Sequence, residues 1–393
     1  RGRFEFEPSL HELCSVGTKE KPNEIYNLFD KIGAKIDWRY ENNTFRAICT
    51  GENGYDVKLR AGEENFCDDM EKAVPGCRAS VKAFFDLDGK NKETLSYIYK
   101  KKGKPNPLVM LFKHGDFMRS ASHSVEDVEK ALGMPEKARN ILNTYWCYLG
   151  VPTDELSAFH YMTMVESYVN GAAMPYKRSH ELSLAIEKAI TDNGGEVWYN
   201  SPATKFLYNE DGSCKGVELA NGEQIFAKEI ISNVIPNNVY EMSAPKFVPE
   251  RELRLANSRK LGITFVTIYL GLDCTKEELG LNDYTVFISK DGNPRKCFDK
   301  RLDGYYYVVN CLNAVIPDCT PEGTSTLFYT IPLFGNEIPA DLSPENYKKW
   351  KNDVAKRFIE DSEKVLGVSI MPHIEEIEVA TPVTFARYLG TPD

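Results

Sequence analysis

Five short apolar runs between residues 194 and 236 predict a compact β-rich segment in the middle of the chain. Asp211-Gly212 and Asn221-Gly222 separate three of these runs, and such dipeptides supply the positive φ angles that tight hairpin turns need. We therefore expect a β-meander here. The last run ends at the polar Asn233, a pattern typical of a strand buried in the middle of a parallel sheet. The five expected strands are residues 196–199, 205–209, 215–219, 224–227 and 229–232.

Outside this segment, the spacing of apolar positions predicts a helical region followed by a sheet. Phe4 and Phe6 alternate with charged residues, which predicts a half-buried strand over residues 3–7. Residues 61–168 have the pattern of several helices separated by glycine and proline. The apolar, β-branched runs of the second half predict a mixed or antiparallel sheet of at least four strands. The other expected helices are 22–32, 179–193 and 344–365, and the other expected strands are 35–39, 44–49, 55–59, 261–272, 284–289, 305–310, 325–331 and 375–380.

Composition and charge narrow the classes of function. The 393 residues suffice for two domains with a substantial core. Lys and Arg number 48 against 58 Asp and Glu, a net charge of −10. This balance argues against nucleic acid as a partner, because phosphate binding needs a basic surface. No apolar run approaches the ~20 residues of a membrane span.

The ten cysteines indicate reduced thiols and no metal site. None forms a C-x-x-C pair, and none stands at a metal-ligand spacing from a histidine. Scattered free thiols are typical of a reducing compartment, so we expect a cytoplasmic protein.

One short basic and apolar stretch leaves two interpretations open. Four lysines within residues 100–104 precede the apolar residues 105–112. A weak peripheral membrane contact has this pattern, and so has a solvated helix end whose lysines complement the helix dipole. The oligomeric state does not follow from the sequence.

The order of elements around the meander resembles that of one enzyme family. After a helix come Gly194-Gly195, the strand that begins at Ala203, an Asp-Gly turn, the run GVELANG at 216–222 and an apolar run that ends in Ser-Asn. This order resembles the second FAD-contacting block of the FAD-dependent oxidoreductases of the phytoene desaturase, carotenoid isomerase and retinol saturase family. The tail TPVTFARYLGTP at 381–392 is similar to the family's segment before its C-terminal FAD block.

The chain begins at Arg1 without a methionine, ends at Asp393 and contains no G-x-G-x-x-G motif. We therefore expect an internal fragment that lacks the family's N-terminal dinucleotide-binding unit and C-terminal FAD block. The resemblance implies an α/β fold in which a partial Rossmann-like FAD-binding domain joins a substrate domain with a helical lid. The implied FAD-binding parts are residues 1–20 and 171–236, the substrate-binding parts are 21–170 and 237–380 with the lid at 61–168, and residues 381–393 return toward the FAD-binding domain.

The resemblance also implies site residues near the N-terminus. The segment FEPSLH at 6–11 fits the family strand that leads to the flavin, which makes Glu7, Ser9 and Leu10 candidate cofactor-binding residues. Ser9 stands where the family usually has glycine, which allows the backbone to approach a flat ring closely. His11 is the candidate catalytic residue because histidine is the commonest acid–base group, and an ordinary loop or core histidine is the other interpretation.

Two further candidate cofactor-binding residues lie in and after the meander. Ala203 begins the strand that passes the adenosine in the family. Asn233 offers an amide donor and acceptor at a strand end, where a turn cap is the other interpretation. Residues 174–182 (MPYKRSHEL) resemble the family motif y-P-x-G-G-x-x-x-L, with Arg178 and Ser179 in place of its glycines.

The implied function is an FAD-dependent oxidoreductase that acts on carbon–carbon bonds of an apolar polyene or isoprenoid-like substrate. Hydride exchange with the flavin would desaturate, saturate or isomerise the substrate, and the protein would supply the tunnel and the electrostatics. An amine-oxidase-like flavoenzyme with a polar substrate is the first alternative. The second is a non-catalytic lipid- or partner-binding domain, which the replaced glycines favour.

Overall fold

The computed structural model describes residues 2–8, 10–52, 54–102, 104–259 and 261–390. The chain forms two compact units. Unit 1 comprises Arg1–Ile186 and Ile263–Thr381, and unit 2 comprises Glu187–Gly262 and Pro382–Asp393. The units group the chain differently from the domains expected from the family, since residues 1–20 and 171–186 pack with unit 1. The functional division into cofactor and substrate domains stays a prediction.

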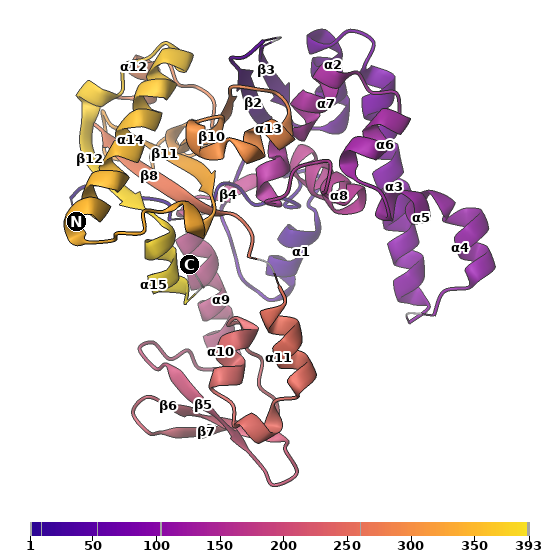
Figure 1. Cartoon of the computed structure of the whole chain (residues 1–393), viewed down its shortest axis with the longest axis vertical. Coiled ribbons are helices and arrows are strands. Elements are labelled where there is room, and N and C mark those ends of the chain that lie inside the picture. The colour runs from indigo at the N-terminus through magenta and orange to yellow at the C-terminus, as the bar shows by residue number, and fades with distance from the viewer. Residues whose placement is uncertain (1, 9, 53, 103, 260, 391–393) are drawn as a thin grey trace. The chain divides into compact units, whose positions relative to one another are not determined.

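Unit 1 contains a seven-stranded sheet with the strand order β12-β8-β11-β10-β9-β2-β3 (Figure 1). Neighbouring strands are antiparallel except β2 and β9, which are parallel. The expected mixed sheet of at least four strands is thus confirmed, and its size comes from the addition of the early β2–β3 hairpin. The strands are β2 Asn43–Cys49, β3 Tyr55–Arg60, β8 Thr264–Leu272, β9 Thr285–Ser289, β10 Tyr306–Cys311, β11 Ser325–Leu333 and β12 Ile374–Ala380.

The two faces of this sheet are covered by different helices. Val286 and Ile288 pack in one core cluster with the long helix α14 (Pro344–Leu366). Phe287, between them in the sequence, packs in the other cluster with the helical region. Side chains alternate between faces along a strand, so a continuous apolar strand serves both cores.

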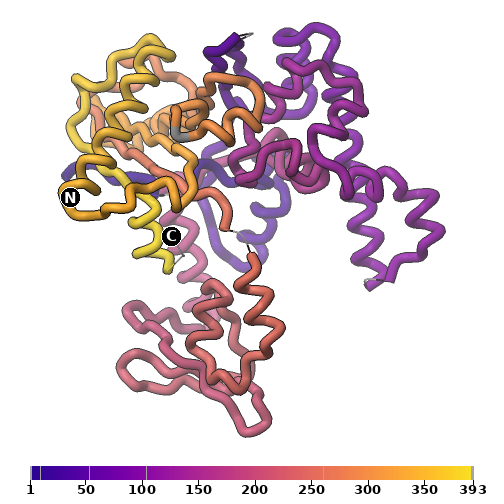
Figure 2. Tube along the Cα trace, in the orientation of Figure 1, coloured from indigo at the N-terminus to yellow at the C-terminus, as the bar shows by residue number. Residues whose placement is uncertain are grey.

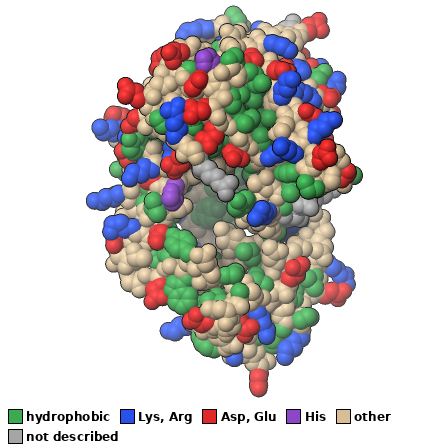
Figure 3. All heavy atoms as spheres, turned by 90° about the vertical axis from the view of Figure 1, so that its left-hand side faces the viewer, with side chains coloured by type: hydrophobic (Ala, Val, Ile, Leu, Met, Phe, Trp, Pro, Cys, Tyr) green, Lys and Arg blue, Asp and Glu red, His purple; other side chains and the backbone are tan. Residues whose placement is uncertain are grey.

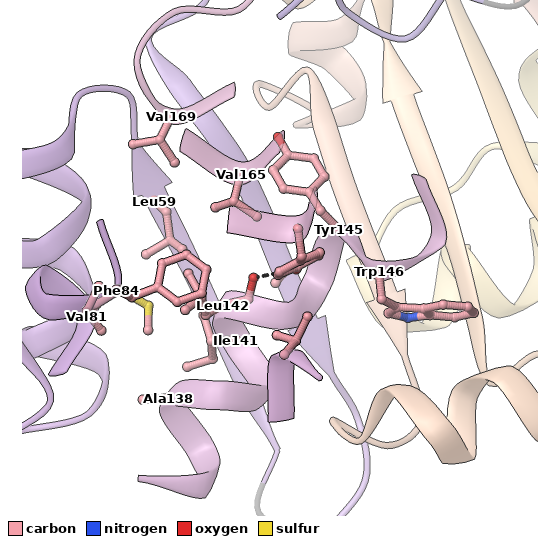
Figure 4. Close-up of a cluster of buried hydrophobic side chains, with 14 of the residues drawn as sticks. Leu59, Val81, Phe84, Ala138, Ile141, Leu142, Tyr145, Trp146, Val165 and Val169 are labelled. Carbon is pink, nitrogen blue, oxygen red and sulfur yellow. Dashed lines mark hydrogen bonds between the residues drawn. The ribbon is translucent and has the colours of Figure 1, made fainter. Parts of the chain in front are cut away.

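The helical region expected over residues 61–168 is confirmed (Figure 4 shows part of its core). Ser124 caps helix α6 because its hydroxyl accepts the N–H of Asp127 at 3.1 Å. The fully buried Trp146 and Tyr145 lie on the 3-10 helix η1 between α7 and α8. The elements are α2 Glu63–Ala73, α3 Arg78–Lys100, α4 Pro107–Lys113, α5 Gly115–Ala121, α6 Val125–Ala131, α7 Glu136–Leu142, η1 Asn143–Tyr148 and α8 Ala158–Val169.

The N-terminal segment is not the strand that the alternation of Phe4 and Phe6 predicts. It lies on the β8 face instead, where a Cβ atom on Gly271 would approach the Phe4 ring to 2.4 Å. Strand β8 already pairs with β11 and β12, so its backbone offers no free edge. Figure 2 shows this segment beside β12, and Arg3 there donates from Nε to Oε1 of Glu375 at 2.9 Å.

A second, two-stranded sheet in unit 1 pairs β1 with β4. Helix α1 ends before Gly33, whose φ of +76° is the left-handed conformation that commonly follows the last turn of a helix. Strand β1 begins later than the expected residues 35–39. The remaining elements of unit 1 are α1 Glu24–Lys31, β1 Trp38–Tyr40, β4 Ala173–Pro175, α9 Arg178–Asp192 (which continues into unit 2), α12 Lys276–Leu279, α13 Pro294–Asp299, and the 3-10 helices η3 Arg301–Asp303, η4 Leu312–Ala314, η5 Gly335–Glu337 and η6 Met371–His373.

Unit 2 contains the expected meander as three antiparallel strands. Gly212 and Gly222 both adopt a φ of +85°, which confirms the hairpin turns. The prediction of strands at residues 196–199 and 229–232 is wrong, since both segments are irregular, and Ile231 is 96% exposed. A strand needs a neighbour for its backbone, and no described strand pairs with either segment. The elements are β5 Ala203–Tyr208, β6 Cys214–Leu219, β7 Gln224–Phe226, α10 Pro236–Glu241, η2 Pro245–Phe247, α11 Glu250–Asn257 and α15 Pro382–Leu389.

Candidate functional site

Strand β4 brings two glutamates to one place in the interior of unit 1. Leu13 and Tyr40 both pair with Ala173, one on each side of the strand. Glu12 and Glu41 therefore lie opposite the residues that flank Ala173, and these flanking positions share one face of the strand. Glu12 is 3% exposed and Glu41 is 8% exposed. We call Glu12 and Glu41 the glutamate pair.

Three of the four carboxyl oxygens of the glutamate pair are buried and accept no hydrogen bond from the described residues. Each of the two groups acts on the pKa of the other, and two neighbouring buried carboxylates would repel each other, so at least one of the two carries a proton. Oε1 of Glu12 also lies 2.9 Å from the Tyr145 hydroxyl, which lies 3.0 Å from the carbonyl oxygen of Thr44. Tyr145 has a single proton for these two acceptors. If it donates to Thr44, the contact with Glu12 is a hydrogen bond only when Glu12 is protonated as well.

Burial holds protons on the glutamate pair. Desolvation raises the pKa of Glu12, and the hydrogen bonds from Glu41 and Tyr145 oppose this rise only in part. Desolvation raises the pKa of Glu41 strongly, and the neighbouring charge of Glu12 adds to the effect. Among the described residues, neither carboxyl has a basic partner that would favour its charged form.

Tyrosines surround the glutamate pair. The ring of Tyr145 lies 4.9 Å from the rings of both Tyr148 and Tyr168. The Tyr148 hydroxyl is buried and has no hydrogen-bond partner among the described residues. Burial and the charge of Glu12 raise its pKa, so the group is a neutral phenol that can both donate and accept.

The predicted catalytic residue His11 lies next to this cluster. Its Nε2 is 2.7 Å from the hydroxyl of Thr330, and its ring contacts Tyr148 and Phe328 at 5.9 and 5.3 Å between centroids. The Tyr284 hydroxyl donates to its backbone carbonyl. His11 is thus held by sheet and helix residues beside buried acids, and its catalytic role stays a prediction.

The other N-terminal candidates have structural partners. Glu7 accepts the N–H of Leu10 at 2.9 Å and the N–H of Ser179 at 2.8 Å, so its carboxylate caps the start of α9. Leu10 packs against a small apolar cluster near Tyr284. Ser9 lies outside the described residues. Arg178, at a family glycine position, adopts a φ of +60°, which explains the preference for glycine there.

The two candidates in unit 2 are open to solvent. Ala203 is exposed at the start of β5, opposite Leu219 of β6. Asn233 is exposed in an irregular segment, not at the end of a strand. The structure therefore places Glu7, Leu10 and His11 in unit 1, and Ala203 and Asn233 in unit 2.

One group of potential metal ligands comes together that sequence spacing misses. Asp273, Cys274 and His373 each place a ligand atom within 4.8 Å of the others. Nδ1 of His373 lies 2.9 Å from Oδ1 of Asp273, an ion pair when the imidazole is protonated. Burial raises the pKa of the Cys274 thiol to about 11, which disfavours the thiolate that a metal needs. The expected absence of a metal site stays a prediction.

A third buried glutamate lies in the helical core of unit 1. Glu129 accepts from Asn143 at 2.9 Å, and burial raises its pKa to about 8. The folded state keeps the proton that the unfolded state loses near pH 4.5, so unfolding becomes easier as pH rises from 4.5 to 8. Between pH 5 and 8 we expect Glu129→Gln to lose less unfolding free energy than the unchanged protein, by about 1.4 kcal/mol for each pH unit.

Urea denaturation at several pH values measures this difference. Glu136→Gln on the exposed surface of α7 is the control and should follow the unchanged protein. Parallel stability curves for Glu129→Gln and Glu136→Gln would mean that Glu129 is ionised in the folded state.

The sequence of the chain is similar to those of several known proteins. No protein-family model matches the chain. The chain is 24% identical to the all-trans-retinol 13,14-reductase of Danio rerio over 99% of its own length and 69% of that protein. It is 26% identical to a 4,4'-diapophytoene desaturase of Methylomonas sp, over 61% of the chain and 46% of that protein. It is 27% identical to the chloroplastic prolycopene isomerase of Daucus carota, over 58% of the chain and 36% of that protein.

The chain is thus similar to retinol reductases, carotenoid desaturases and prolycopene isomerases, which are the family that its sequence resembles. It spans between 36% and 69% of the length of these three relatives. Among solved structures, an oxidoreductase from Methanosarcina mazei shares the fold, with a TM-score of 0.60 and 13% identity over 94% of this chain and 75% of that chain. The mixed α/β fold expected for the family is confirmed.

Sequence reasoning about this family missed Glu12, Glu41 and the tyrosines around them. Glu12 directly follows His11, and Glu41 lies in a polar stretch that has the composition of an exposed loop. Only the pairing of two distant segments with β4 buries them together. The signal available in the sequence was the adjacency of an acid to a candidate catalytic histidine.

Proposed function

We propose that this chain is an FAD-dependent oxidoreductase acting on carbon–carbon double bonds of an apolar polyene. The observation that carries the proposal is the similarity to a retinol 13,14-reductase over 99% of the chain, which includes both units. The relatives named as desaturase and isomerase act on other polyenes, so the shared chemistry is the polyene carbon–carbon bond.

The residues of the chain fit different parts of an FAD molecule to different degrees. Ala203 and Asn233 are exposed, so a methyl group and an amide are accessible to an adenosine. Glu7 fits poorly as a direct ligand, because both its oxygens already accept hydrogen bonds at the start of α9. We assign Glu7 to positioning Leu10 and the start of α9, and Leu10 and His11 to the flavin side.

When bound, FAD supplies hydride transfer to or from the substrate. The chain contributes an apolar, aromatic interior and groups that hold protons. His11 lies beside Tyr148 and the glutamate pair, so protons, aromatic surface and a candidate acid–base group share one region of unit 1. An amine-oxidase-like activity on a polar substrate is the first alternative. A non-catalytic lipid- or partner-binding domain, which Ser9, Arg178 and Ser179 favour because they replace family glycines, is the second.

The absorbance spectrum of the natural protein, purified without added cofactor, tests this proposal. We expect oxidised-flavin bands that dithionite bleaches and that return when a polyene such as a retinoid or carotenoid accepts the electrons under anaerobic conditions. If the oxidised-flavin bands return when a polyene is added and no amine is present, the result supports a polyene substrate over an amine. A colourless protein that also takes up no added FAD would contradict the flavoenzyme proposal and favour the non-catalytic domain.

We also propose that helix α4 contacts an anionic membrane surface, from which an apolar substrate would be drawn. Leu108, Leu111 and Phe112 follow helical spacing and are all largely exposed. Lysines at positions 100, 101, 102 and 104 precede this helix, and Lys113 is its last residue. We define this set of three apolar residues and five lysines as the α4 surface. Figure 1 shows α4 at the tip of the helical region, away from the sheet of unit 1.

The combination of charge and apolar exposure favours a lipid surface as the partner of the α4 surface. Anionic headgroups attract lysines, and apolar side chains gain free energy on entering the acyl boundary. The described residues contain no helix that is long and apolar enough to cross a bilayer. On the face of the molecule shown in Figure 3, unlike the α4 surface, acidic and basic side chains are interspersed. The expectation that the chain binds no nucleic acid stays a prediction.

A further inference from the structure

We propose that the glutamate pair stores the proton that is added to the polyene when a double bond is reduced. This inference deepens the proposed function and rests on it. It starts from three observations: strand β4 brings both glutamates to one place, three of their four carboxyl oxygens are buried without a donor, and the fourth lies 2.9 Å from the Tyr145 hydroxyl.

The reaction itself requires such a group. Reducing a carbon–carbon double bond adds a hydride to one carbon and a proton to its neighbour. A bound reduced flavin would supply the hydride with its electron pair and would end oxidised, so that the π bond breaks and two C–H bonds form. The glutamate pair loses one proton, becomes more negative by one charge, and regains the proton from water. Desaturation is the same step in reverse, in which the pair accepts the proton.

The position of the pair is costly for stability and therefore indicates a function. Burying a carboxyl group without a basic partner costs free energy, and a protein that needed only packing would place apolar side chains here. Oε2 of Glu12 and both oxygens of Glu41 have no ordinary hydrogen-bond donor among the described residues. The pair thus depends on its own protons for its hydrogen bonds.

The other buried acids of unit 1 lack this arrangement. Glu129 accepts a hydrogen bond from Asn143 and lies near the positive Arg139. Asp88 accepts from Thr163 and pairs with Lys92 at 3.2 Å. These acids are held by donors and basic groups and have structural explanations. Among the buried acids of the described residues, direct contact between two carboxyls is found at Glu12 and Glu41.

The groups around the pair suit proton storage. The titratable side chains that act on the pair or are affected by it are Tyr145, Tyr148, Tyr168 and Tyr284. Burial raises the pKa of the four tyrosines, so these groups stay neutral. The neutral hydroxyl of Tyr148, beside His11, offers a donor and acceptor on the side of the candidate catalytic histidine. In the proposed role, Glu12 and Glu41 store the proton and position it for transfer.

Infrared spectroscopy of the protein without substrate tests whether the pair holds a proton. We expect a protonated-carboxyl C=O stretching band at pH 7 that shifts in D2O and that disappears in Glu41→Gln, whose amide keeps a donor for Glu12. Glu129→Gln is the matched control, because it removes a buried glutamate elsewhere in unit 1 and should remove a different band. An unchanged carboxyl spectrum in Glu41→Gln and Glu12→Gln would overturn the proposal.

Stopped-flow oxidation of the dithionite-reduced holoenzyme by a polyene tests delivery of the proton. We expect Glu41→Gln and Glu12→Gln to slow this step by about a hundredfold or more and to flatten its dependence on pH, with flavin content unchanged. Glu129→Gln should keep the rate and the profile. Wild-type rates and pH profiles in both pair variants would overturn the proposal. A protein without flavin contradicts the proposed function instead, and the absorbance spectrum identifies that case beforehand.

Discussion

Phe45→Ala is expected to destabilise unit 1 by about 3–5 kcal/mol. Phe45 is 1% exposed and meets three aromatic rings edge to face, with centroid distances of 4.9 Å to Tyr145, 5.5 Å to Phe287 and 6.2 Å to Phe66. The three rings belong to the same core cluster as Phe45 and are held by three different elements, α2, η1 and β9, so they cannot close around the space that the deleted ring leaves. The loss is the transfer free energy of the ring together with the cost of the cavity.

Urea denaturation followed by tryptophan fluorescence measures this loss as a lower midpoint at an unchanged slope. Tyr99→Ala is the control, because this exposed side chain at the end of α3 should change stability by less than about 0.5 kcal/mol. Equal midpoints for the two variants would mean that Phe45 does not sit in a closed core. Loss of stability would also loosen Tyr145, which contacts Glu12.

Phe112→Asp is expected to weaken binding to anionic vesicles by roughly tenfold to a hundredfold. Phe112 is 81% exposed on the α4 surface. Burying a side chain of this size in an apolar phase contributes ~1.5–3 kcal/mol, and each 1.4 kcal/mol is about tenfold in binding. The negative charge of the new aspartate also offsets part of the positive charge of the lysines, which attracts the anionic headgroups. Folding should be unaffected, since the helix buries none of its residues.

Co-sedimentation with phosphatidylcholine vesicles that contain phosphatidylserine measures this effect. Binding should fall with added salt and with removal of phosphatidylserine, because the lysine contribution is electrostatic. Phe226→Asp is the matched control, an exposed phenylalanine on β7 of unit 2 that should leave binding unchanged. Equal effects of the two substitutions, or binding that does not depend on phosphatidylserine, would contradict the proposal that the α4 surface contacts an anionic membrane.

Local patterns in the sequence predict most of the individual elements. The Asp-Gly and Asn-Gly turns determine the meander of unit 2, and Gly212 and Gly222 adopt the φ angles that such turns require. Apolar periodicity likewise predicts α14 and the strands from β8 to β12. These signals succeed because each depends on the residues of one short segment.

Failures occur where a segment needs a partner that lies elsewhere in the chain. Residues 229–232 have a strand composition, but no described strand pairs with them, and they are irregular. Residues 3–7 alternate correctly for a strand, yet the edges of β8 are already occupied. The addition of β2 to β9 was not predicted either, because pairing across more than 200 residues leaves no local pattern.

The same reason limits prediction of the candidate site. The family resemblance placed His11 in a segment that does lie beside buried acids and tyrosines. It did not indicate Glu41, whose burial with Glu12 depends on the pairing of β1 and residue 13 with β4. Chemistry that arises from tertiary contact, such as two acids sharing a proton, is invisible to motif spacing.

The parallel pairing of β2 with β9 has a consequence for synthesis of the chain. Residues Arg46–Cys49 of β2 pair with Val286–Ser289, so the hairpin must wait for about 240 further residues before its sheet neighbour is made. At roughly 5–20 residues per second, this delay lasts on the order of ten to fifty seconds. During that time the ring of Phe45 has no sheet core to join. We therefore expect nascent chains to depend on chaperones at this hairpin, and the completed protein to do so far less.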